Sequence, residues 1–228
     1  MVSACLFSKA VRVHGYHWCP TPKTVGTTSL VANVLCGHHN SGLSELDTEA
    51  KSYQQAVTEA GRLLGVRSAF KRPGVWNRIT LNVEGPLLER WFLKTLVNSL
   101  IADGAQFLWH GSSTVSPPMA YVSWAFDGAS LPAPSGLYGS ADLDRTFQFG
   151  TDFILGLTPI FEKSGHLAGG LFEFLGFRWI LWLLQTPFPT ADIPYLQPAW
   201  EAQAPMFHLV QYDFRIGKNV SHSIRFRW

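Results

Sequence analysis

The sequence predicts an α+β protein with two main helices and a mostly antiparallel C-terminal β-sheet. Residues 43–64 and 86–102 carry apolar side chains at helical spacing, which predicts two amphipathic helices. Beyond residue 112, short apolar stretches alternate with polar residues between turn-forming residues, a pattern typical of antiparallel strands. The chain has 228 residues, 46% hydrophobic and 15% charged, so it can bury a substantial core.

Charge and cysteine content narrow the function classes. The formal net charge is only +2, so any contact with DNA must come from a local basic patch. Cys5, Cys19 and Cys36 make an odd count without a disulfide framework, which favours a reducing compartment, and we expect a cytoplasmic protein. The first residues lack the sustained apolar core and cleavage site of a signal peptide.

Residues 1–66 begin irregularly and end in the first predicted helix. Residues 1–35 contain scattered Pro and Gly, and only the short apolar stretch 29–35 is compatible with a strand. Ser44 and Asp47 resemble a capping box at the start of the helix, and Gly65 is its predicted end. The apolar stripe of the helix comprises Leu43, Leu46, Tyr53, Val57, Ala60 and Leu64.

The second helix follows a predicted half-buried strand at residues 75–83. Pro86 suits the first turn of this helix and Gly104 its C-terminal cap. Arg90 and Lys94 are i,i+4 neighbours that we expect on a solvated face. The predicted buried stripe comprises Leu88, Trp91, Phe92, Thr95, Leu96, Ser99 and Leu100.

The C-terminal region predicts a series of strands. Within it, residues 166–188 are apolar enough to raise the alternative of a membrane span. Glu173, Arg178 and three glycines in this segment favour strands instead. We therefore expect no membrane partner. Turns are predicted at residues 164–165 and 169–170. The predicted strands cover residues 119–126, 137–139, 147–149, 153–157, 171–177, 178–184, 206–214 and 221–228.

The richest motif lies just before the first helix. Cys36 and His39 stand three residues apart, so a thiolate and an imidazole can reach one tetrahedral ion from the first turn of a helix, the geometry that zinc prefers. Asn40 follows directly. The competing interpretation is an ordinary buried thiol at Cys36 beside a polar loop.

The segment VLCGHHNSGLSELDTEA, at residues 34–50, resembles the last third of an HNH-type treble-clef finger. It is most similar to a branch of HNH-like proteins in which such a segment leads into a long helix, and the likeness covers about residues 27–53. The resemblance implies a degenerate treble-clef segment at residues 1–66, followed by an α+β domain at residues 67–228. It also implies a structural zinc bound by Cys36 and His39.

The first zinc knuckle departs from the family pattern. Cys5 would begin it, but Ser8 stands where the second cysteine belongs, and a hydroxyl is a poor zinc ligand beside thiolate and imidazole. Cys19, or one of His14 and His17, is then left to complete the site.

The resemblance also implies a catalytic set. The family uses a His as general base, a middle Asn that orients it, and a further residue that holds a catalytic magnesium or other divalent ion. His17, Asn33 and Asn40 are the nearest candidates for these roles. Cys19 occupies the place of the base itself, and His17 lies two residues earlier. We therefore expect weak DNA cleavage or none.

Three functions remain open at this point. The first is an HNH-endonuclease-related zinc-binding protein acting on DNA as a metal-dependent phosphodiesterase of weak or lost activity. The second is a non-catalytic, zinc-stabilised binding or scaffold protein whose aromatic sheet contacts an unknown protein partner. The third is a globular protein without metal. Residues 112–228 contain no recognisable catalytic set, since their acidic residues are scattered.

Overall fold

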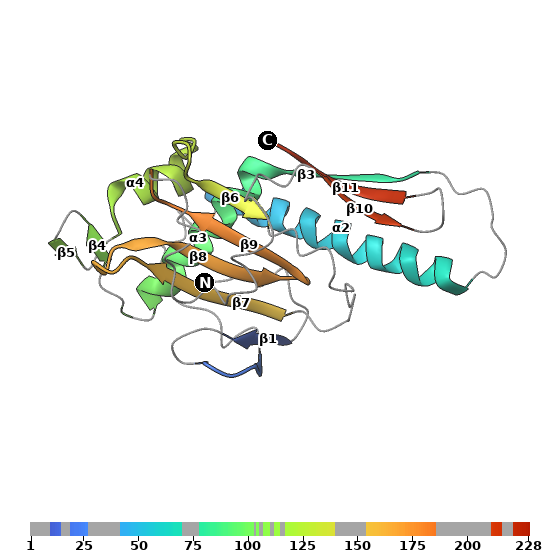
Figure 1. Ribbon diagram of the computed structural model, residues 1–228, viewed down its shortest axis with the longest axis horizontal. Helices are drawn as coiled ribbons and strands as arrows, with labels where there is room; N and C mark the ends of the chain where they lie inside the picture. Colours follow the sequence, from blue (N-terminus) through green and yellow to red (C-terminus); the bar gives the residue numbers. More distant parts are fainter. Residues whose placement is uncertain are drawn as a thin grey trace.

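The computed structural model describes residues 10–14, 19–26, 42–69, 78–102, 104, 107–109, 112–114, 117–139, 154–185, 211–215 and 221–228. In these residues the chain is α+β, as predicted, and its strands form a mostly antiparallel mixed sheet (Figure 1). The α-helices are α2 (Ser44–Ala69), α3 (Gly85–Ala102) and α4 (Met119–Val122), which runs into the π-helical turn η3 (Ser123–Asp127). The strands are β1 (Ala10–His14), β2 (Lys23–Gly26), β3 (Thr80–Glu84), β4 (Phe107–Trp109), β5 (Ser112–Thr114), β6 (Gly136–Gly139), β7 (Ile154–Phe161), β8 (Leu167–Phe174), β9 (Phe177–Trp182), β10 (Gln211–Arg215) and β11 (Ser221–Arg227).

The largest sheet has six strands in the order β2-β1-β7-β8-β9-β6. Only the pairing of β1 with β7 is parallel, and the other pairings are antiparallel. A second sheet has the order β10-β11-β3, with β3 parallel to β11, and β4 pairs with β5 in a short hairpin. Because β1 and β7 share a sheet, the N-terminal hairpin and the C-terminal region are joined in one layer.

Within the apolar segment, residues 167–182 fold as the β8–β9 hairpin, so the prediction of strands there is confirmed, although the turn lies at residues 175–176 and not after residue 177 as predicted. Leu175 and Gly176 have φ angles of 55° and 82°, the left-handed values of a two-residue type I′ turn. This turn sets Phe174 opposite Phe177 and Glu173 opposite Arg178. Among the described residues, no helix is long and apolar enough to span a membrane.

Helix α3 lies at the centre of the molecule, behind β8 and β9 in the view of Figure 1. The Phe92 ring packs edge-on against Phe172 with centroids 4.6 Å apart, and Trp91 stacks on Phe174 at 5.3 Å. The predicted buried stripe of α3 is confirmed. Burial extends beyond this stripe, since every residue from 91 to 100 is buried. Gly104 has a φ of 69° and donates to the Ile101 carbonyl, as expected for a C-terminal cap.

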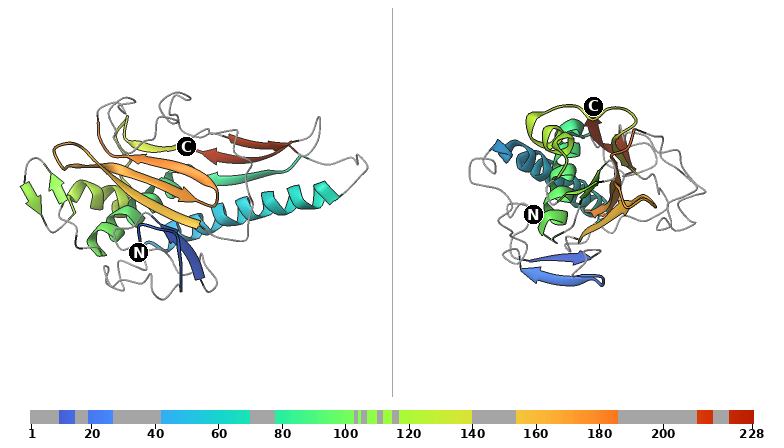
Figure 2. Two further views of the ribbon diagram at one scale, coloured as in Figure 1. Left: turned by 60° about the horizontal axis from the view of Figure 1, so that its bottom comes forward. Right: turned by 90° about the vertical axis from the view of Figure 1, so that its left-hand side faces the viewer.

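Helix α2 packs with its apolar stripe on α3 and both sheets, and it runs beneath the three-stranded sheet in Figure 1. Buried Tyr53 accepts a hydrogen bond from Trp179 Nε1 at 3.3 Å, and its ring faces Phe226 of β11 at 6.1 Å. The views of Figure 2 show α2 as the longest rod of the fold. The predicted end at Gly65 is wrong, since the helix continues to Ala69. Glycine costs a helix only about 1 kcal/mol, and burial of nearby Leu63 offsets it.

The predicted strand at residues 119–126 is also wrong, because this stretch forms α4 and η3. Tyr121 and Ala125 are both buried, four residues apart, which is a helical spacing. The Tyr121 hydroxyl donates to the Leu167 carbonyl at 3.2 Å.

Arg90, expected in solvent, donates from its guanidinium to the carbonyls of Ala125 and Phe126 at 3.2 and 3.3 Å. Cationic donors of this kind stabilise the C-terminal end of a helix.

Two further expectations are corrected. Residues 10–26, expected to be irregular, contain the β1–β2 hairpin, whose Val11 and Val13 are buried in the core. Gly169 and Gly170 lie inside β8 and not in a turn. A Cβ at Gly169 would lie 1.9 Å from the Leu181 carbonyl oxygen, so glycine is needed there for close strand pairing. The turn at residues 164–165 is confirmed, and the predicted strand 147–149 lies outside the described residues.

Candidate functional site

The structure describes two of the side chains that the sequence singles out for the metal site, Cys19 and His14. Both belong to the N-terminal hairpin, His14 as the last residue of β1 and Cys19 just before β2. The other predicted site residues lie outside the described residues, so their roles stay predictions: Cys5, His17, Asn33, Cys36, His39 and Asn40.

Cys19 is a buried thiol with only 3% of its surface exposed. Its sulfur lies 3.2 Å from the carbonyl oxygen of Thr21 and 3.5 Å from that of Val13, both within reach of the S–H donor. The side chain therefore links the end of β1 to the segment that leads into β2. A thiol in this position is poorly placed to take a proton from water, and its assignment as a zinc ligand stays a prediction.

A polar row crosses the six-stranded sheet beside the hairpin. His14, Gly156, Glu173 and Arg178 are register partners on β1, β7, β8 and β9, so they lie side by side on one face. His14 Nε2 lies 3.0 Å from Glu173 Oε2, and Arg178 Nε lies 3.0 Å from Glu173 Oε1. One carboxylate thus holds an imidazole with one oxygen and a guanidinium with the other.

Gly156 makes this row possible. A Cβ at Gly156 would lie 2.6 Å from His14 Cε1 and 3.2 Å from Glu173 Cβ, so the imidazole passes directly over the glycine backbone. The side chains of His14 and Glu173 are 27% and 33% exposed, so solvent screens the electrostatic attraction between them only in part. The row is a half-buried, rigidly supported group of titratable side chains.

Two acidic residues of the motif that resembles HNH proteins, Asp47 and Glu49, make contacts within the fold. Asp47, in the first turn of α2, forms a 2.5 Å ion pair with Lys94 of α3. Lys94 was predicted on a solvated face, and this is wrong, since its side chain is only 3% exposed. Glu49 Oε1 accepts a hydrogen bond from the Glu84 backbone N–H at 2.7 Å, at the junction of β3 and α3. Burial raises the pKa of Glu49, and this hydrogen bond acts in the opposite direction.

A second buried carboxyl, which sequence reasoning missed, lies on α3. Glu89 Oε2 accepts a hydrogen bond from the Leu137 backbone N–H of β6 at 2.7 Å. Burial raises the pKa of Glu89 to about 7, against the effect of the Leu137 hydrogen bond. Its position next to the apolar stripe is a signal in the sequence, because residues 85, 89, 92 and 96 share one helical face.

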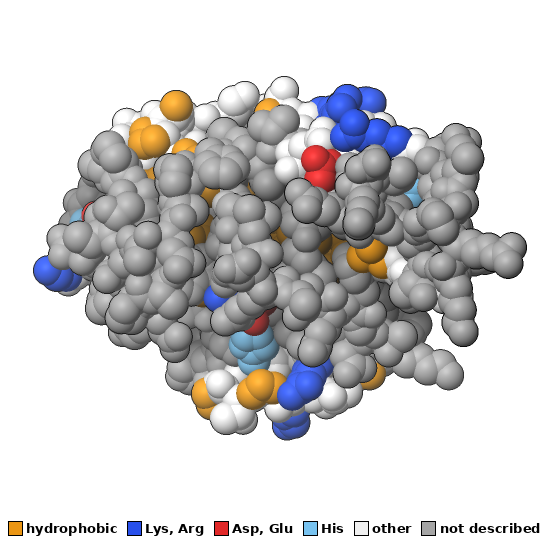
Figure 3. Space-filling model, turned by 45° about the vertical axis from the view of Figure 1, so that its right-hand side comes forward, with side chains coloured by type: hydrophobic (Ala, Val, Ile, Leu, Met, Phe, Trp, Pro, Cys, Tyr) orange, Lys and Arg blue, Asp and Glu red, His pale blue; other side chains and the backbone are white. Residues whose placement is uncertain are grey.

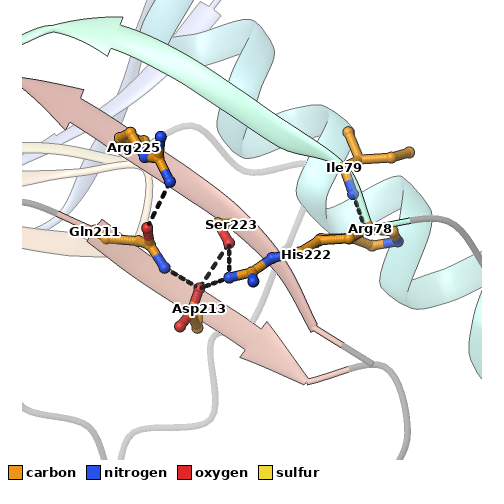
Figure 4. Close-up of polar contacts among 7 residues, drawn as sticks. All are labelled: Arg78, Ile79, Gln211, Asp213, His222, Ser223 and Arg225. Carbon is orange, nitrogen blue, oxygen red and sulfur yellow. Dashed lines mark hydrogen bonds and ion pairs between the residues drawn. The ribbon is translucent and has the colours of Figure 1, made fainter. Parts of the chain in front are cut away.

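The outer face of the three-stranded sheet carries a polar network (Figure 4). Asp213 accepts hydrogen bonds from Ser223 Oγ and Gln211 Nε2, each at 2.7 Å, and Arg78 lies 3.7 Å from the same carboxylate. On the buried side, His222 Nδ1 accepts from the Ile79 backbone N–H at 2.9 Å, which ties β11 to the start of β3.

Basic residues gather on this sheet, and Figure 3 shows Lys and Arg side chains grouped along one edge of the molecule beside an acidic side chain. Arg78 faces Asp213, and Arg227 pairs with Glu84 at 3.3 Å. These carboxylates reduce the net positive charge that the described part of the sheet can offer to DNA.

Within the described residues, no group of three or more His, Cys, Asp or Glu side chains is arranged to hold a metal ion. Comparison of the chain with protein-family models, with curated proteins and with solved structures finds no match.

Proposed function

We propose that this chain is an HNH-endonuclease-related zinc-binding protein that cleaves DNA weakly or not at all. The observation that supports it is the order of Cys36, His39 and Asn40 followed by a long helix, since α2 begins at Ser44, directly after the motif. In this proposal residues 1–66 form a degenerate treble-clef segment, and α2 is its terminal helix.

Zinc would be held by Cys36 and His39, completed by Cys5 or Cys19 and by a histidine of the N-terminal hairpin. Thiolate and imidazole donors suit zinc, and Cys19 on the described hairpin is a donor of this kind. When bound, the ion supplies a structural cross-link in a segment with little core of its own. Magnesium or another divalent ion would be needed only for residual cleavage at His17, Asn33 and Asn40.

Low activity follows from the state of Cys19. The resemblance puts this residue in the place of the general base, and its thiol is buried against the carbonyls of Val13 and Thr21. An imidazole suits the role of a general base near neutral pH, whereas the sulfur of Cys19 is turned toward two backbone carbonyls. A base supplied by His17 would have to act from two residues away, and misplacement by about 1 Å can cost about a hundredfold in rate.

We expect purified protein to contain about one zinc ion per chain, measured by elemental analysis. Cys36→Ser and His39→Ala should each remove most of it, because a tetrahedral site that loses one ligand binds zinc far more weakly. His166→Ala is the matched control, since His166 lies in the β7–β8 turn and bonds to Ser164. Zinc well below one ion per chain in the wild-type protein would contradict the proposal.

We also expect no robust nicking of supercoiled plasmid in the presence of magnesium, manganese or zinc. The physical reason is that no histidine occupies the place of the general base, which would activate the attacking water. His17→Ala and Asn40→Ala should therefore leave the low background rate of plasmid nicking unchanged. Strong nicking that His17→Ala abolishes would show that the loop carries a functional base and that the activity has been misjudged.

The alternative is a non-catalytic, zinc-stabilised binding or scaffold protein. It is favoured by the use of Asp47 and Glu49 for internal contacts with Lys94 and with the Glu84 backbone. A DNA gel-shift titration at several salt concentrations separates the two proposals. Binding that weakens steeply with salt supports a nuclease-related protein, and absent binding supports the scaffold.

A further inference from the structure

We infer that His222 is an acid-sensitive switch in the three-stranded sheet. In its neutral form the imidazole holds the start of β3 against β11, and protonation of the imidazole releases that start. The residues that carry this inference belong to the sheet and to α2, so it does not depend on the proposed zinc site.

The first step is the position of His222 on β11 (Figure 4). The residue is only 1% exposed, and its Nδ1 accepts a hydrogen bond from the Ile79 backbone N–H at 2.9 Å. The Ile79 carbonyl in turn accepts from the Ser223 backbone N–H at 2.9 Å. Both backbone polar groups of the residue before β3 therefore bind β11, one of them through the imidazole.

The second step is the protonation state that this contact requires. A backbone N–H can only donate, so Nδ1 of His222 carries no proton, and the neutral ring holds its proton on Nε2. Protonation would place a second donor on Nδ1, opposite the Ile79 N–H, and the hydrogen bond could not form. Burial also lowers the pKa of His222, which disfavours the charged ring in the closed sheet.

The third step is that the opening is local. Strand β3 lies at one edge of the sheet order β10-β11-β3, so its start can separate from β11 without breaking a central strand. Its other end is held independently of His222. Glu49 Oε1 accepts from the Glu84 backbone N–H at 2.7 Å, and Arg227 pairs with the Glu84 side chain at 3.3 Å.

The charged side chains around His222 leave the start of β3 dependent on the imidazole. On the outer face, Arg78 donates to Ser223 Oγ at 3.3 Å and lies 3.7 Å from Asp213, and such exposed ion pairs contribute little. On α2, which packs on the other face, Glu59 and Arg62 bind each other through hydrogen bonds of 2.7 and 2.6 Å. Histidine is the side chain whose ordinary pKa lies between pH 5 and 8.

The direction of the pH effect follows from linkage. The ordinary pKa of histidine is 6.5, and that of His222 is lowered while the start of β3 is closed. The open form therefore binds the proton more tightly, so the stabilisation of the closed form is complete above pH 6.5 and is lost as pH falls. Between pH 7.5 and 5.0 the equilibrium constant for opening should rise by as much as about 30-fold.

The test is amide hydrogen exchange of the full chain, followed by NMR at pH 7.5 and 5.0 and corrected for the intrinsic exchange rate at each pH. The Ile79 and Ser223 amides should lose protection at pH 5.0 by up to about 30-fold, whereas the amides of β8 and β9 should keep theirs. His222→Asn should abolish this loss, because the asparagine oxygen can replace Nδ1 as acceptor and cannot be protonated. His166→Asn is the matched control and should retain the loss, since His166 lies in the β7–β8 turn and bonds to Ser164.

Equal protection of Ile79 in the wild-type protein at both pH values would overturn the inference, and so would the same loss in His222→Asn. A titration of the wild-type imidazole by nitrogen-15 NMR covers a folding defect in that variant. A proton on Nε2 at pH 7.5 with a pKa below 6.5 supports the switch. A proton on Nδ1, or a pKa above 6.5, overturns it.

Discussion

Replacing Lys94 by alanine is expected to lower the free energy of unfolding by about 3–5 kcal/mol, the usual cost of breaking a buried ion pair. The Lys94 ammonium lies 2.5 Å from Asp47 Oδ1, and the two side chains are 3% and 20% exposed. Without Lys94, the partly buried carboxylate of Asp47 loses its cation at the contact between α2 and α3. Urea denaturation followed by circular dichroism measures the loss.

Three further variants show whether the ion pair is the cause. Lys51→Ala is the matched control, because Lys51 is exposed on α2, and its effect should stay within about 0.5 kcal/mol. Asp47→Asn should also destabilise, since it leaves the buried ammonium without its anion. Lys94→Met combined with Asp47→Leu should recover much of the loss, because apolar side chains of similar size can replace a buried pair. A cost below 1 kcal/mol for Lys94→Ala would contradict this account.

The failed prediction for Lys94 has a clear physical origin. Helical periodicity places residue 94 opposite the stripe of Leu88, Phe92 and Leu96, and for a helix packed on one side that face meets water. Here α2 covers that face, and α3 is buried all round. A helix that is buried on all sides is recognisable in a sequence only because it has few charged residues. Arg90 and Lys94 gave this helix one charged turn, so it was interpreted as a helix with a solvated face.

Periodicity succeeded where the segments were long. The stripe of residues 43–64 gave the correct helix, because many positions agreed on one helical period. The strands β8 and β9 were predicted on other grounds, from the charges of Glu173 and Arg178 and from three glycines. Residues 119–126 are too short for this: Ala120, Val122 and Trp124 suggest a strand, whereas Tyr121 and Ala125 fit a helix. Tertiary burial of Tyr121 decided the outcome.

The polar row was not predicted from the sequence. The predicted strands 171–177 and 178–184 put the turn after Phe177, whereas the turn lies at Leu175 and Gly176 and places Glu173 opposite Arg178. His14 was missed for another reason, because β1 joins the sheet by a parallel pairing with β7 from the far end of the chain. No local pattern encodes such a pairing, so the row became visible only in the fold.

Stability is expected to fall as pH rises through the range in which Glu89 ionises. Burial raises the pKa of Glu89 from its ordinary value of 4.5 to about 7 in the folded protein. The folded state therefore holds this proton more tightly than the unfolded state. The resulting stabilisation is fully present below about pH 4.5 and is lost as pH approaches 7. One pKa unit corresponds to about 1.4 kcal/mol, so the total change is about 3 kcal/mol.

Glu89→Gln should remove this dependence. The glutamine side-chain oxygen can still accept the hydrogen bond from Leu137 N–H, but no buried charge forms at high pH. We therefore expect the variant to be more stable than the wild type by about 1–3 kcal/mol at pH 8 and nearly equal to it at pH 4.5. Urea denaturation at half-unit pH steps measures both curves.

Glu45→Gln is the matched control, because Glu45 is an exposed glutamate at the start of α2. The free energy of unfolding of this variant should differ from that of the wild type by a nearly constant amount at every pH. If Glu89→Gln is instead less stable than the wild type at pH 8, the ionised carboxylate contributes net stability through its bond to Leu137 N–H. The charge-assisted hydrogen bond would then outweigh desolvation, and Glu89 would hold β6 to α3 in its charged form.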